Sequence, residues 1–280
     1  MRRSASLLAP LLASLLWPGV AAAQAVSGTE ITSDYAVYAA GLNTARLHVA
    51  LAFAPASYRL RLGYRTAGLF GVFFHAESST LAEGAWQGGG AAPRHFAATG
   101  RFQGVDRQTV IDYAGGQPIV RTLLPPNDGE REAVPSALRQ NTIDTLSAMA
   151  LLLRDVQASG GCEAHAVTFD GRRLIDVTAH TAGVEVLPRS GRSAFFGPAL
   201  RCDFEGRQLA GFRRADDQAE LRRPKHGSAW LAQVLPGAPP IPIRLSFETR
   251  WFGMATLYLT ATRAGMPAAI AGARPKNSGP

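Results

Sequence analysis

The chain has 280 residues, a formal net charge of +8, two cysteines and 46% hydrophobic residues. This apolar content excludes disorder along the whole chain, because disordered proteins are poor in apolar residues and rich in charge. Two cysteines are also too few for a small scaffold held together mainly by disulfides.

Residues 1–25 have the pattern of a cleavable secretory signal peptide. Arg2 and Arg3 precede a short apolar run, and small residues follow it at a position suited to cleavage after Ala23 or Ala25. The run is shorter than the roughly 20 residues that span a bilayer, which disfavours an anchor helix. Cleavage would lower the net charge from +8 to +6 by removing the two arginines. We therefore expect a periplasmic or secreted protein that has no transmembrane segment after cleavage and binds no nucleic acid.

Hydrophobic and polar residues alternate with a period of two along most of the remaining chain. In the segment 57–65, Tyr58 and Leu60 share one face of the expected strand, and Arg59 and Arg61 share the other. Turn residues separate such segments at the spacing of an antiparallel sheet. Gly88-Gly89-Gly90 predicts a mobile loop. Further strands are predicted at 34–40, 44–54, 69–81, 94–102, 106–113, 117–123, 183–188, 198–205, 207–213, 228–235, 241–250 and 253–262.

One segment has helical rather than strand periodicity. A helix is predicted over 141–157, with Asn141 as its N-cap and Gly160 shortly after its end. Its centre is apolar almost all round, which indicates burial on more than one side. We therefore predict a mainly β fold in which a strongly bent antiparallel sheet surrounds this helix. A single domain is expected over 26–263, and the aperiodic residues 264–280 predict a disordered tail.

Two pairs of residues are candidates for specific contacts. Cys162 and Cys202 predict a disulfide in an oxidising compartment, with a reactive thiol as the alternative. The Asp-Gly step at residues 170–171 predicts a two-residue type I′ hairpin, which would place His165 opposite Asp176. Such a pair is commonly an ordinary polar contact, although a hydrolase could use it together with an unassigned serine. The histidine spacing predicts no metal site, and no cofactor motif is present.

The apolar residues of the helix, together with an apolar run that precedes it, could either fill the core or line a ligand cavity. The candidate lining residues are Phe70, Phe73, Phe74, Ile143, Leu146, Met149, Leu152 and Leu153.

Several motifs in the second half resemble a known family. They are the hairpin 169–177, Cys202 followed by Leu209-Ala210-Gly211-Phe212, Trp230-Leu231 followed by Ile241-Pro242-Ile243-Arg244-Leu245, and the last strand, 252–259. These motifs resemble exported proteobacterial proteins catalogued as domain of unknown function family 3108. The resemblance implies an architecture like that of the periplasmic lipoprotein carrier LolA and its receptor LolB. It implies no established activity, so no catalytic residue can be assigned from it.

The preferred interpretation is a non-enzymatic periplasmic protein whose bent sheet holds or shields an apolar or lipid molecule. One alternative is an envelope assembly or interaction module with a filled core, which would bind an envelope protein. A hydrolase built on His165 and Asp176 is the remaining alternative.

Overall fold

The computed structural model describes residues 30–127, 129–249 and 253–265. The predicted signal peptide and residues 266–280 of the predicted tail lie outside this part of the chain. Residues 264 and 265, assigned to that tail from the sequence, instead belong to the last strand.

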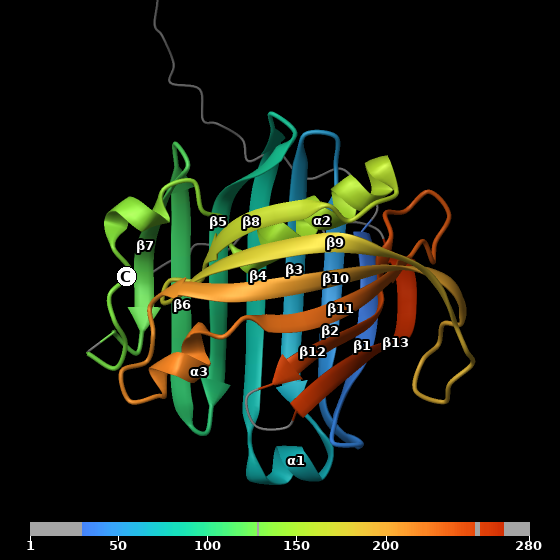
Figure 1. Ribbon diagram of the computed structural model, residues 1–280, viewed down its shortest axis with the longest axis horizontal. Coiled ribbons are helices and arrows are strands. Elements are labelled where there is room, and N and C mark those ends of the chain that lie inside the picture. Colours follow the sequence, from blue (N-terminus) through green and yellow to red (C-terminus); the bar gives the residue numbers. More distant parts are fainter. Residues whose placement is uncertain (1–29, 128, 250–252, 266–280) are drawn as a thin grey trace, which may run out of the picture.

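Thirteen antiparallel strands form one sheet in the order β7-β6-β5-β4-β3-β2-β1-β13-β12-β11-β10-β9-β8. Strands β7 and β8 are the two edges, so the sheet is not closed. The sheet bends sharply, so that β8–β12 cross in front of β3–β6 (Figure 1). The predicted bent, mainly β architecture is therefore confirmed.

The first half of the sheet is a series of hairpins, because each strand pairs with the next one along the chain. Its strands are Glu30–Ala39 (β1), Leu42–Phe53 (β2), Ser57–Thr66 (β3), Ala76–Gln87 (β4), Gly90–Phe102 (β5), Val105–Ala114 (β6) and Gln117–Leu124 (β7).

The second half follows helix α2, and its last strand returns to pair with β1. Its strands are Ala164–Phe169 (β8), Leu174–Leu187 (β9), Gly197–Ala210 (β10), Lys225–Ala232 (β11), Ile241–Thr249 (β12) and Gly253–Gly265 (β13). The helices are Gly68–Phe73 (α1), Thr145–Ser159 (α2) and Gln218–Arg222 (α3), and Ser136–Arg139 forms one 3-10 turn (η1).

Several predictions of strands and loops were wrong. The apolar run predicted to begin a strand at 69 forms α1, and the strand starts only at Ala76. Gly88 and Gly89 form a tight hairpin turn rather than a mobile loop, with φ values of 56° and 83° that match a type I′ turn. The strands predicted at 198–205 and 207–213 are one strand, β10.

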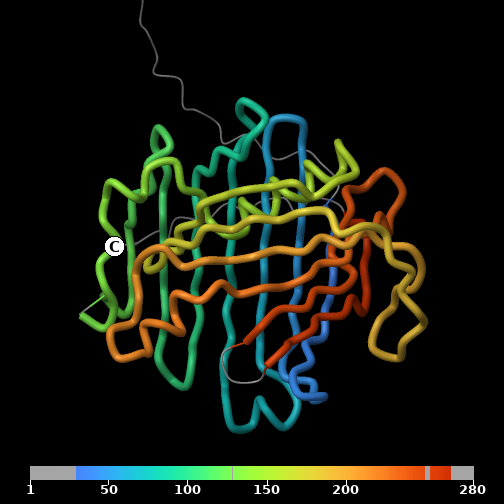
Figure 2. Tube along the Cα trace, in the orientation of Figure 1, coloured from blue at the N-terminus to red at the C-terminus, as the bar shows by residue number. Residues whose placement is uncertain are grey.

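Helix α2 lies between the two halves of the sheet (Figures 1 and 2). It begins later than predicted, because Asp144 rather than Asn141 is its N-cap. Asn141 instead has a positive φ of 57° in the preceding turn. The helix ends as expected at Gly160, whose φ of 75° gives the left-handed conformation that terminates many helices.

A buried chain of hydrogen bonds fixes the start of α2 to the first half of the sheet. The Asp144 carboxylate, which is fully buried, accepts from the Ser147 backbone N–H (2.8 Å) and hydroxyl (2.6 Å). The Ser147 Oγ in turn accepts from the Tyr58 hydroxyl of β3 at 2.7 Å. Burial raises the pKa of Asp144, and its hydrogen bonds to Ser147 only partly offset this effect.

This burial predicts how stability depends on pH. Because the pKa of Asp144 is higher in the folded state, folding favours its protonated form. The contribution of Asp144 to folding stability is therefore lost as the pH rises from its pKa in the unfolded chain, about 3.9, through its higher pKa in the folded protein. Asp144→Asn keeps a capping oxygen without this titration, so wild type should lose stability relative to the variant over that window. Urea denaturation of both proteins at several pH values measures the difference, and parallel curves would contradict the prediction.

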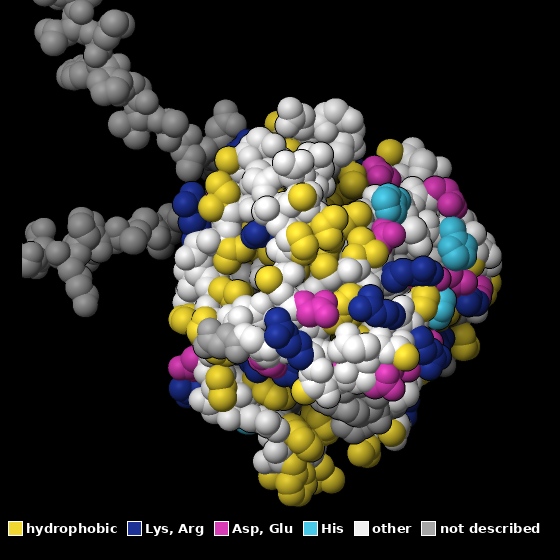
Figure 3. Space-filling model, turned by 60° about the vertical axis from the view of Figure 1, so that its left-hand side comes forward, with side chains coloured by type: hydrophobic (Ala, Val, Ile, Leu, Met, Phe, Trp, Pro, Cys, Tyr) yellow, Lys and Arg dark blue, Asp and Glu magenta, His cyan; other side chains and the backbone are white. Residues whose placement is uncertain are grey.

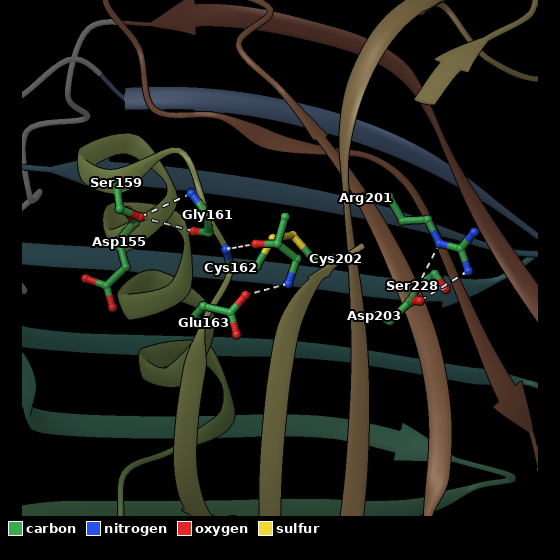
Figure 4. The surroundings of a disulfide bond; sticks show 10 residues. Asp155, Ser159, Gly161, Cys162, Glu163, Arg201, Cys202, Asp203 and Ser228 are labelled. Atoms are coloured by element: carbon green, nitrogen blue, oxygen red, sulfur yellow. Dashed lines mark hydrogen bonds and ion pairs between the residues drawn. A yellow bond between two sulfur atoms is a disulfide. The ribbon is translucent and has the colours of Figure 1, made fainter. Parts of the chain in front are cut away.

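A disulfide fixes the other end of α2 to the second half of the sheet. Cys162, which follows the helix, is bonded to Cys202 of β10, with 5.8 Å between their Cα atoms (Figure 4). Both cysteines are buried. The Cys162 N–H donates to the Thr181 hydroxyl, and the Glu163 carboxylate accepts from the Thr181 N–H, each at 2.8 Å. The predicted disulfide is present, and α2 is held at both ends.

Candidate functional site

A hollow of about 700 Å³ lies between α2 and the second half of the sheet. Helix α2 has two apolar faces. Leu146, Ala150 and Leu153 are buried, and the helix contacts β3, β4 and β5. Met149 and Leu152 are only partly buried and line the hollow. The apolar residues on more than one side of α2, which predicted a buried helix, therefore pack into the core on one side and line the hollow on the other.

The opposite wall of the hollow is formed by one face of strands β8–β12. Alternate residues of each strand point toward the hollow because side chains alternate between the faces of a sheet. The wall residues are Ala166, Thr168, Ile175, Val177, Ala179, Phe204, Gly206, Gln208, Ala229, Leu231, Pro242, Leu245 and Phe247.

The aromatic ring of Phe204 reaches its position because the neighbouring strand carries a glycine. Phe204 on β10 pairs with Gly227 on β11. A Cβ atom at Gly227 would lie 2.3 Å from Cζ of Phe204 and 2.7 Å from the Ser246 carbonyl oxygen. The ring therefore lies across the glycine, and Gly227 is required for this part of the wall.

One end of the hollow is charged, in contrast to its apolar walls. The charged residues come from α3 and its flanks and from the isolated bridge between Arg131 and Arg213. Figure 3, which brings this side forward, shows hydrophobic side chains gathered among charged ones. The charged lining residues here are Arg131, Arg173, Arg213, Asp216, Asp217, Glu220, Arg223 and Lys225.

Several of these charges are paired, but Arg131 is held by a neutral group. Arg213 bonds to the Glu130 carboxylate, and Lys225 bonds to Glu220. Nη1 of Arg131 donates to the Gly211 carbonyl oxygen at 3.0 Å. Burial lowers the pKa of Arg131, and the charges of Arg173 and Arg213 lower it further. The carboxylates of Glu130 and Asp170 act in the opposite direction but more weakly, so the surrounding charge favours an anionic group beside Arg131.

The hairpin between β8 and β9 supplies Arg173 to this end. Its turn differs from the prediction, since Phe169 pairs with Leu174 and four residues lie between them. The Asp170 carboxylate accepts the N–H groups of Arg172 (2.9 Å) and Arg173 (2.7 Å). Burial opposes ionisation of Asp170, but the Arg173 charge and these hydrogen bonds outweigh it and lower its pKa.

This four-residue turn also changes the strand register. His165 pairs with Thr178 rather than with Asp176, which pairs with Val167. The two side chains still meet diagonally, with 2.6 Å between Nε2 of His165 and Oδ1 of Asp176. The His165 side chain is 62% exposed. The geometry is that of a surface hydrogen bond at one side of the hollow.

The predicted lining residues separate into three groups. Met149, Leu152 and Leu153 line the hollow. Leu146 belongs to the buried core, and Ile143 forms a parallel bridge with Thr168. Phe70, Phe73 and Phe74 belong to α1 and its C-cap, at the far end of the first-half strands (Figure 1). These three residues do not line this hollow, because the run that contains them leaves the sheet as a helix.

The wall residues on β9, β10 and β12 were missed. The alternation of Ile175, Val177 and Ala179 with polar neighbours was a visible signal for one apolar face. It did not indicate that α2 would leave part of this face uncovered.

Other types of site receive less support. In the described part of the chain, no group of three His, Cys, Asp or Glu residues could hold a metal ion. No described helix has the length and hydropathy needed to cross a membrane. A second hollow of about 920 Å³ over β1–β5 is lined by many polar side chains, including Asp34, Arg46 and Glu77, and so resembles a hydrated groove.

Comparison with known proteins identifies a family. The model of the family "Protein of unknown function (DUF3108)" matches residues 34–260. No curated protein matches the chain. Two solved structures are similar at 10% identity. One is a β-barrel-like protein of domain of unknown function DUF1849 from Brucella abortus, with a TM-score of 0.48 over 86% of this chain and 99% of that one. The other is a putative outer membrane lipoprotein-sorting protein domain from Vibrio parahaemolyticus, with a TM-score of 0.29 over 89% of this chain and 88% of that one. These TM-scores support no argument about function. The family match, in contrast, covers most of the chain. The chain therefore belongs to the DUF3108 family of proteins of unknown function.

Proposed function

We propose that this protein binds an amphiphile with a hydrocarbon chain, such as a fatty acid, in the hollow between α2 and β8–β12. The observation that carries the proposal is the hollow itself, with apolar walls and a volume of about 700 Å³. Ligand pockets for small molecules commonly measure roughly 300–1,000 Å³ and are lined mainly by apolar side chains. A filled interaction module would not need such a space.

The charged end of the hollow supports an acidic head group on this ligand. Arg131 lies among other cations, and its only hydrogen-bond acceptor in the described contacts is the Gly211 carbonyl oxygen. A carboxylate there could accept a charge-assisted hydrogen bond while the hydrocarbon chain contacts Val177, Phe204 and Leu245. The predicted signal peptide and the disulfide between Cys162 and Cys202 support a periplasmic or secreted location.

The first test fills the hollow without altering the core. Ala148 on α2 is partly buried and lines the hollow, so Ala148→Trp should occupy it and weaken uptake of a fluorescent fatty acid at least tenfold. Ala158 is exposed on the same helix and does not line the hollow, so Ala158→Trp is the matched control. Fluorescence titration measures both affinities. Equal binding by the two variants, with both folded, would refute the proposed binding site.

The second test concerns the acidic head group. Arg131→Gln should weaken binding of a fatty acid at least tenfold, since a charge-assisted hydrogen bond contributes about 1.5–3 kcal/mol. Binding of the matching fatty alcohol should change little, because an alcohol carries no charge. Competition titrations with the two ligands measure the difference. An equal loss for acid and alcohol would indicate that Arg131 supports the shape of the hollow rather than the charge of the ligand.

A further inference from the structure

More than half of the exposed large hydrophobic residues gather at one end of the molecule. The connections β1–β2, β3–β4 and β5–β6 meet at this end, with α1 at the tip (Figure 1). The start of β13 lies there as well, because Ala255 pairs with Ala39 at the end of β1. We define this apical end by its eight exposed hydrophobic residues, among fourteen in the described chain. They are Leu42, Leu69, Val72, Phe73, Phe74, Phe102, Val105 and Met254.

Helix α1 has its large apolar side chains on the outside, whereas a helix that packs onto a core has them on the inside. Its small residues face the protein, since a Cβ atom at Gly68 would lie 2.7 Å from the Asn43 carbonyl oxygen and one at Gly71 would lie 3.2 Å from the Thr66 carbonyl carbon. Three of its four large residues face outward, since Leu69, Val72 and Phe73 are 74–77% exposed. Figure 3 shows hydrophobic side chains covering the lowest part of the molecule, where Figure 1 places α1. This outward surface is available for an apolar partner.

The base of α1 is held by specific hydrogen bonds. The Ala67 N–H donates to the Thr44 carbonyl oxygen at 2.9 Å. The Thr66 hydroxyl accepts from the Ala76 N–H (3.1 Å) and donates to the Ala76 carbonyl oxygen (3.3 Å). The protein therefore presents the hydrophobic tip in a defined position, and its exposure does not result from a missing anchor.

The charges around the tip favour an anionic surface. Arg46 and Arg65 are exposed and lie opposite each other on β2 and β3. On the β5–β6 hairpin, Arg101 pairs with Asp106 at 2.7 Å, and the guanidinium of Arg107 lies over the Phe102 ring, 5.8 Å from its centroid. Glu77 lies opposite both Arg65 and Arg101, and Glu248 lies opposite Met254, so four arginines stand against three acids around the tip. The same arginines would repel those of a second copy meeting it face to face, which disfavours a symmetric dimer here.

We propose that this apical end docks the protein on the surface of an anionic lipid bilayer, with the α1 side chains inserted among the acyl chains and the arginines at the phosphate groups. Apolar side chains flanked by cations are the combination by which proteins bind to bilayer interfaces. No residue of α1 lines the hollow, so docking through α1 does not depend on the function proposed for the hollow.

Co-flotation with vesicles tests the docking. The wild-type chain without its predicted signal peptide should float with vesicles of phosphatidylglycerol and phosphatidylethanolamine, and much less with vesicles of phosphatidylcholine. The triple variant Leu69→Ser, Val72→Ser, Phe73→Ser should lower the partition coefficient at least tenfold. Val184→Ser with Val186→Ser is the matched control, because these β9 residues are 69% and 76% exposed but lie outside the apical end, and it should bind within twofold of wild type.

Three outcomes would overturn the proposal. They are absence of wild-type flotation with the anionic vesicles, flotation of the triple variant equal to wild type, and a wild-type dimer in analytical ultracentrifugation that the triple variant abolishes. Arg46→Gln with Arg65→Gln should remove most of the preference for anionic vesicles, and an unchanged preference would refute the assigned role of the arginines. Fatty acid uptake by the triple variant should equal that of wild type, so failure of docking and failure of ligand binding are distinguishable.

Discussion

Gly211→Ala is expected to destabilise the protein by roughly 3 kcal/mol or more, a large effect for the addition of one methyl group. Gly211 follows β10 and has a φ of 80°, a backbone conformation that residues with a side chain rarely adopt. Its added Cβ would lie 1.9 Å from the Arg172 carbonyl oxygen, which is a backbone atom of the β8–β9 hairpin. The hairpin would have to move, and with it Arg173 and the contact of Arg131 with the Gly211 carbonyl oxygen.

Gly237→Ala is the matched control for this variant. Gly237 has a φ of 73°, but a Cβ there would meet nothing within 4 Å. Its substitution should therefore cost only the backbone strain, about 1–2 kcal/mol. Urea denaturation of the two variants separates the strain from the close approach. Equal destabilisation would contradict the packing of the hairpin against Gly211, whereas loss of soluble protein for Gly211→Ala alone would agree with it.

Removal of the disulfide is expected to cost about 2–5 kcal/mol. The bond between Cys162 and Cys202 joins residues 40 apart in sequence and thereby restricts the unfolded chain. It also joins the end of α2 to β10, so its loss should release the last turn of the helix from the second half of the sheet. The variant Cys162→Ala with Cys202→Ala should therefore show a lower denaturation midpoint and faster hydrogen exchange near the end of α2.

The redox dependence of this effect provides its control. Because both cysteines are buried, a reductant should act only after the protein is unfolded. Wild type refolded with a reductant should have the midpoint of the double variant, and the double variant should have the same midpoint with and without reductant. If fully reduced wild type kept the midpoint of the oxidised protein, the disulfide would not stabilise the fold.

The sequence predicted the bent β architecture, the central helix and the disulfide because each has a local signal. Alternation such as that of Tyr58 and Leu60 marks a strand, and the apolar centre of 145–159 marks a helix buried on more than one side. These signals depend on burial, which is encoded by residue type at every position.

The errors occurred where individual contacts, rather than the periodicity of apolar residues, decide the structure. Asp170–Gly171 is a common type I′ sequence, yet the Asp170 carboxylate accepts the N–H groups of Arg172 and Arg173 and stabilises a longer turn. The strand predicted at 69–81 begins instead with α1, and the inner side of α1 is set in part by the approach of Gly68 to the Asn43 carbonyl oxygen. The hollow was likewise only partly predicted. Its residues on α2 were expected, but its other wall comes from β8–β12, and no local pattern shows that α2 leaves these strands partly uncovered.

The central claim is that the hollow between α2 and β8–β12 holds an apolar chain. Native mass spectrometry of the wild-type protein, exported and purified without detergent, tests it most directly when Ala148→Trp and Ala158→Trp are prepared in parallel. Wild type and Ala158→Trp should retain a bound lipid whose mass is released on denaturation, and Ala148→Trp should carry none. A wild-type protein without bound lipid that also fails to take up added fatty acid, or an Ala148→Trp variant that retains the lipid, would contradict the claim.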